Sequence, residues 1–83
     1  MTVHKELIER PSGVYEARII IEGPDVVIAV RKAVGGVFNY TAEAITTADR
    51  LRAFNDPERI VKDTIDLLIK RIEGAVYRGQ TRV

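Results

Sequence analysis

Cysteine and tryptophan are absent from the 83 residues, and histidine occurs only once. Without cysteine the chain has no disulfide, thiolate metal site or cysteine nucleophile, so packing alone must stabilise the fold. The single histidine, His4, has no second ligand or catalytic partner at a recognisable spacing, and we interpret it as a solvent-exposed side chain. We therefore predict no metal site and no cofactor.

Long hydrophobic runs are also missing. No segment approaches the roughly 18 apolar residues of a membrane span, and the N-terminus lacks the apolar core of a signal peptide. Neither charge dominates, since 13 basic residues stand against 12 acidic ones, and no global field draws the chain to nucleic acid or anionic lipid. We expect a soluble, cytoplasmic protein without a membrane partner.

The residues that are present suit a folded domain, with 46% hydrophobic and 30% charged residues. We predict one small α+β domain over residues 1–83, a three- or four-stranded antiparallel meander followed by a short helix and a longer C-terminal amphipathic helix on one sheet face. A domain this small buries only about 60% of its unfolded surface, and association of copies is a common remedy.

Two strands are predicted by the hydrophobic pattern, over residues 14–22 and 26–34. The first alternates apolar and polar side chains, and the second is β-branched and almost continuously apolar. A turn at residues 23–25 pairs Ile19 with Ile28, which places the best apolar residues of both strands on one face.

Gly35-Gly36 is the signal of a two-residue hairpin, so a third strand should run from about Val37 to Ile45. This pairing sets Arg31 opposite Tyr40 and leaves a second, rather apolar face that one helix cannot cover. Either the N-terminal segment or the short helix folds across that face, or another chain packs on it. The residues that we assign to it as a candidate interface are Val27, Ala29, Ala33, Phe38, Tyr40, Ala42 and Ala44.

Two helices are predicted in the second half of the chain. A threonine cap and apolar residues favour a short helix within residues 46–54, and Asp56-Pro57-Glu58 marks the start of a longer one. Gly74 or Gly79 is expected to end the longer helix, ahead of a mobile tail at residues 80–83. Its apolar stripe comprises Val61, Ile65, Leu68, Ile72 and Val76, widened by Ile60, Leu67 and Ile69.

The N-terminal segment, residues 1–12, fits either a strand or a short helix, and we favour a strand. No residues carry a catalytic pattern. Gly35-Gly36 lacks the following lysine and helix of a phosphate-binding loop, and the strand carboxylates Glu16, Glu22 and Glu43 suit a polar outer face. We predict that the protein is not an enzyme.

Basic residues gather near the end of the longer helix, at Lys70, Arg71, Arg78 and Arg82. Such a patch contacts nucleic-acid phosphates in some proteins, but cations at a helix C-terminus also complement its dipole. A second basic and aromatic set, Arg31, Lys32, Phe38 and Tyr40, has an equally ordinary interpretation as cross-strand pairing.

The leading hypothesis is a non-enzymatic protein-interaction module. We expect a homodimer joined through the alanine-rich sheet face or by edge-strand pairing, with a further protein partner as an open alternative. A small nucleic-acid-binding regulator using the basic helix end is the second hypothesis.

Overall fold

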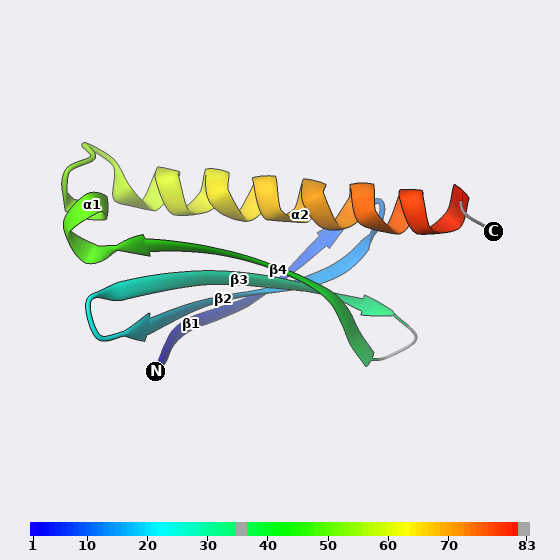
Figure 1. Cartoon of the computed structure of the whole chain (residues 1–83), viewed down its shortest axis with the longest axis horizontal. Coiled ribbons are helices and arrows are strands. Elements are labelled where there is room, and N and C mark those ends of the chain that lie inside the picture. Colours follow the sequence, from blue (N-terminus) through cyan, green and yellow to red (C-terminus); the bar gives the residue numbers. More distant parts are fainter. Residues whose placement is uncertain (35–36, 82–83) are drawn as a thin grey trace.

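In the computed structural model, a sheet is followed by a helix that runs along its length (Figure 1). The structure describes the backbone of residues 1–34 and 37–81, and the side chains of residues 1–33 and 40–75. The sheet is antiparallel in the order β1-β2-β3-β4, which confirms the α+β meander with the N-terminal segment as its fourth strand. The elements are β1 (Thr2–Arg10), β2 (Gly13–Glu22), β3 (Asp25–Val34), β4 (Val37–Thr47), α1 (Ala48–Arg52) and α2 (Pro57–Thr81).

The register between β2 and β3 is the predicted one, with Ile19 opposite Ile28 and Glu22 opposite Asp25 across the turn. The predicted turn at Gly35-Gly36 lies outside the described residues. The pairs that follow it, up to Lys32 opposite Asn39, are also as predicted.

Beyond that point the predicted register of β4 is wrong. Lys32 pairs with Asn39 and Arg31 pairs with Thr41, so Tyr40 is an extra residue in a β-bulge and has a φ of 52°. Because side chains alternate between the two faces, one extra residue turns the rest of the strand over. Ala42 and Ala44 therefore lie on the helix side, packed against the core, and not on the second face.

Tyr40→Gly is expected to raise the free energy of unfolding by about 0.5–1 kcal/mol, because a non-glycine residue in the left-handed region costs about 1–2 kcal/mol and the side chain is half-exposed. Thr41→Gly is the matched control, since the neighbouring Thr41 is exposed and does not have a positive φ, and this variant should lose about 0.5–1 kcal/mol. Urea denaturation measures both variants. A loss of stability in both would show that the bulge at Tyr40 is not strained.

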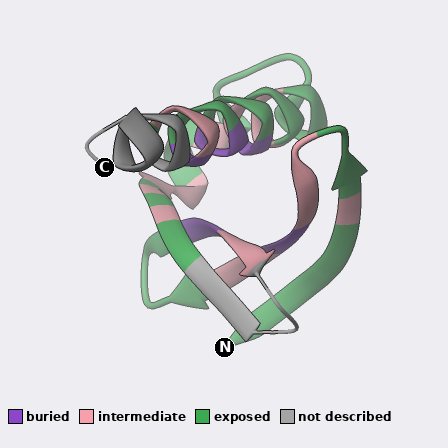
Figure 2. Cartoon of the chain, turned by 90° about the vertical axis from the view of Figure 1, so that its right-hand side faces the viewer, coloured by how far each residue is buried: buried purple, intermediate pink, exposed green. Residues whose placement is uncertain are grey.

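The core lies between α2 and the inner face of the sheet, where buried residues of both layers meet (Figure 2). α2 packs mainly on β3 and β4. Within the described part the predicted stripe is largely confirmed: Ile69 is buried as expected, whereas Leu67 is exposed. The side chain of Val76 lies outside the described residues. The buried cluster comprises Tyr15, Ala17, Ile28, Val30, Ile65, Leu68, Ile69 and Ile72.

Both predicted helix starts are confirmed by their caps. The Thr47 hydroxyl accepts a hydrogen bond from the Arg50 amide at 3.1 Å, and the Asp56 carboxylate accepts one from the Arg59 amide at 3.2 Å. α2 continues past both glycines to Thr81, so neither ends it. Of the expected tail at residues 80–83, the first two belong to α2 and residues 82–83 lie outside the described part.

Candidate functional site

The second sheet face, hereafter the outer face, is the one turned away from α2. Neither the N-terminal segment nor the short helix covers this face. The N-terminal segment is strand β1 of the sheet, and α1 contacts β4 and α2. Of the predicted interface residues, the register keeps Val27, Ala29 and Ala33 on this face, whereas the Phe38 side chain is outside the described part.

The alanine-rich centre of the outer face is covered by the chain itself. Ala29 is only 2% exposed, because it lies directly between Arg18 and Glu43 of the neighbouring strands. Val27 is 8% exposed between Ile20 and Ile45. These two residues therefore offer little apolar surface to a partner.

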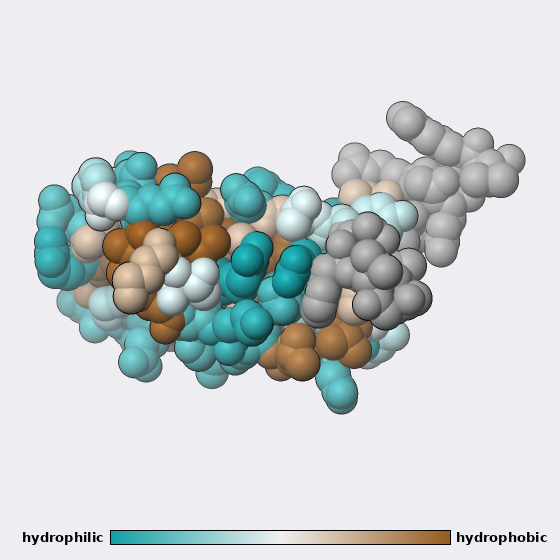
Figure 3. Space-filling model, turned by 90° about the horizontal axis from the view of Figure 1, so that it is seen from below, coloured by the Kyte–Doolittle hydropathy of each residue, from teal (hydrophilic) through white to brown (hydrophobic). Residues whose placement is uncertain are grey.

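An ion-pair cluster around a buried carboxylate lies in the middle of the outer face. Glu16 is 4% exposed and its Oε1 accepts a hydrogen bond from Arg31 Nε at 2.9 Å. The same oxygen forms ion pairs with Arg31 Nη2 at 2.8 Å and with Arg18 Nε at 3.5 Å. These side chains lie on the outer face, which Figure 3 shows with a hydrophilic centre. Arg31 therefore pairs with Glu16, and the expected set of basic and aromatic residues around Tyr40 stays a prediction.

The apolar side chains that remain exposed on the outer face lie toward its two edges. Leu7 on β1 is 66% exposed and Ile45 on β4 is 67% exposed, and Ile45 continues the cross-strand row of Ile20 and Val27. Figure 3 shows an apolar patch at one end of this face, beside the hydrophilic centre. In a strand, Lys5, Leu7 and Glu9 lie on one face, and two of the three are charged. This pattern indicates an exposed β1 once the segment is known to be a strand.

β1 is the more open of the two sheet edges. Every residue from Thr2 to Arg10 is exposed except Ile8, and within the described part no other segment pairs with its free side. The opposite edge, β4, is interrupted by the bulge at Tyr40 and followed directly by α1. Bulges are one of the ways in which proteins block pairing at a sheet edge.

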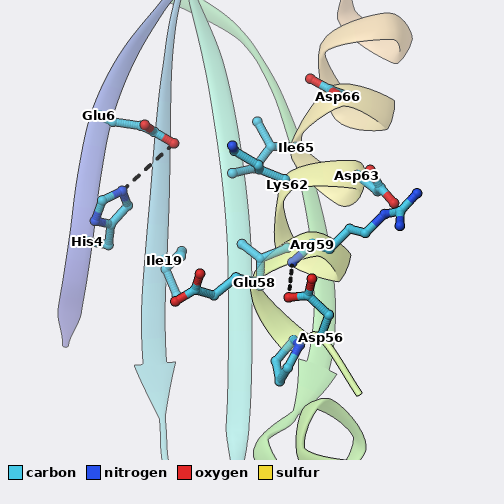
Figure 4. A pocket seen from close by; sticks show the side chains of 12 residues that line it. His4, Glu6, Ile19, Asp56, Glu58, Arg59, Lys62, Asp63, Ile65 and Asp66 are labelled. Atoms are coloured by element: carbon cyan, nitrogen blue, oxygen red, sulfur yellow. Dashed lines mark hydrogen bonds and ion pairs between the residues drawn. The ribbon is translucent and has the colours of Figure 1, made fainter. Parts of the chain in front are cut away.

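A groove of about 790 Å³ separates β1 from the first turns of α2. Figure 4 shows Glu6 and Lys62 reaching into it from opposite sides and Arg59 directed away, and Ile19 and Ile65 also line it. His4 Nε2 lies 3.8 Å from Glu6 Oε1, and both side chains are about half exposed. The groove exists because α2 sits over the other half of the sheet.

The predicted nucleic-acid patch is described only in part. Lys70 and Arg71 are exposed on α2, and neither forms an ion pair with another residue that the structure describes. The side chains of Arg78 and Arg82 lie outside the described part, so the patch stays a prediction.

No family model, curated protein or solved structure matches the chain. Among the residues with described positions, no group of three His, Asp or Glu side chains is placed to hold a metal ion. None of the described helices has the length and hydropathy needed to cross a membrane.

Proposed function

We propose that the protein is a non-enzymatic interaction module that forms a homodimer through the β1 edge of its sheet. The observation that carries this proposal is the free, almost wholly exposed β1, which bears the large apolar side chains of Val3 and Leu7. A free strand edge offers backbone groups for pairing with another strand, and its apolar side chains add contact area.

The proposal prefers the edge to the alanine-rich face for a physical reason. Val27 and Ala29 are already buried by neighbouring side chains, and Ala42 and Ala44 face α2. A partner on that face would have to displace the charged side chains around Glu16. Pairing at the β1 edge needs no such rearrangement.

Light scattering at micromolar concentration should give a mass near twice 9.3 kDa. Leu7→Asp is expected to shift the protein to monomers, because it places a charge in the apolar part of the edge. Leu67→Asp is the matched control, since Leu67 is 54% exposed on α2, away from β1, and should leave the dimer intact. A monomeric wild type at about 100 μM would contradict self-association, and monomers caused only by Leu67→Asp would place the interface on α2.

A further inference from the structure

We infer that the partner of β1 is β1 of a second copy, paired antiparallel about a two-fold axis through Leu7, so that two four-stranded sheets become one with both α2 helices on the same side. The inference rests on the proposed self-association and adds the register and the residues that set it. Three independent features of β1 lead to this register.

The first feature is the extent of the regular strand. β1 pairs with β2 without interruption from His4 to Arg10, whereas a register shift lies between Thr2 and His4 and the turn begins at Pro11. An antiparallel pair of identical segments that uses this whole length must be centred on its midpoint, which is Leu7. A centre at Ile8 would instead bring Pro11 into the ladder, where it has no amide hydrogen to donate.

The second feature is the direction of the backbone groups. Arg10 and Gly13 close the two-residue turn and form a hydrogen-bonded pair, and such pairs alternate with non-bonded ones along an antiparallel ladder. Residues 4, 6, 8 and 10 therefore bond to β2. The register shift between Thr2 and His4 adds one residue, so the next bonded position is Met1, whose carbonyl accepts the 2.8 Å bond from the Ile21 amide. The backbone groups of Lys5, Leu7 and Glu9 face the free edge, and in the Leu7-centred register they oppose Glu9, Leu7 and Lys5 of the second copy.

The third feature is the pairing of side chains. The Leu7-centred register sets Leu7 against its own copy and sets Lys5 against Glu9 on both sides of the axis, so these two charges each meet an opposite charge. A register centred on Glu6 would place two carboxylates face to face, which destabilises a strand pair. Lys5 already lies opposite Arg18 within the chain, and a carboxylate on its other side offsets that like-charge contact.

The test uses charge reversal at these two positions. Lys5→Glu and Glu9→Lys each place like charges opposite one another twice per dimer, and each should raise the dimer dissociation constant by about tenfold to a hundredfold. An equimolar mixture of the two variants should form a heterodimer with nearly the wild-type constant, because every junction then pairs opposite charges. Sedimentation equilibrium of each variant, of the mixture and of the double variant K5E/E9K measures these constants.

Circular dichroism checks that the variants fold, which is expected because both side chains are exposed. Recovery of the dimer in the mixture and in the double variant supports the Leu7-centred register. A dimer that is insensitive to both single reversals, or a mixture no tighter than its components, overturns the register while self-association stands. A monomeric wild type overturns the proposed function itself. Lys5 would then be a charged residue that prevents another strand from pairing with this edge.

Discussion

Leu68→Ala is expected to lower the free energy of unfolding by about 2–5 kcal/mol, a large part of the total for a domain of this size. Leu68 is 1% exposed in the middle of α2 and belongs to the cluster that joins this helix to β3. Truncation removes the transfer free energy of the side chain and leaves a cavity, which a core formed by one helix and one sheet is poorly able to close. Urea denaturation followed by circular dichroism measures the loss.

The preceding residue supplies the control for that prediction. Leu67 carries the same side chain but is 54% exposed, so Leu67→Ala should change stability by no more than about 0.5 kcal/mol. Both variants must be compared at one protein concentration, because a dimer adds stability that depends on concentration. Equal losses in the two variants would contradict the placement of Leu68 in the core and Leu67 outside it.

Periodicity and capping predict much of this fold from the sequence. Asp56 and Pro57 define the start of α2 because the cap and the fixed φ of proline act locally. The β2–β3 register follows from the turn at Gly23 and from the match of apolar faces, which are also local features. Why Ile69 is buried and Leu67 is exposed depends on which strands α2 crosses. The apolar stripe of the helix alone does not specify the direction in which α2 crosses the sheet.

The candidate site was harder to predict because one residue changes it. Tyr40 adopts a positive φ without being glycine or asparagine, so no local rule marks the bulge, yet it moves Ala42 and Ala44 from the outer face to the core. Burial of Ala29 under long charged neighbours likewise depends on cross-strand pairing, which appears only once the register is known. The interface prediction thereby moves from the centre of the sheet to its β1 edge.

Arg31→Met is expected to lower the free energy of unfolding by about 1.5–3 kcal/mol, because it removes the hydrogen bond and the close ion pair that Arg31 forms with a carboxylate that is only 4% exposed. Arg18 remains near Glu16, at 3.5 Å, and compensates only in part. The methionine keeps much of the apolar stem of the arginine, so the loss reports mainly on the charge that leaves Glu16 buried without its main partner.

A double-mutant cycle separates this coupling from the other contacts of Arg31. Glu16→Leu together with Arg31→Met should recover most of the stability lost in Arg31→Met alone, since replacing both members of a buried ion pair by apolar residues is often neutral. Arg52→Met is the matched control. Arg52 forms an ion pair with Asp49, and both side chains are largely exposed, so the pair should contribute less than about 1 kcal/mol to the free energy of unfolding. If Arg31→Met lowers the free energy of unfolding by no more than Arg52→Met does, the buried Glu16 does not depend on Arg31 for stability.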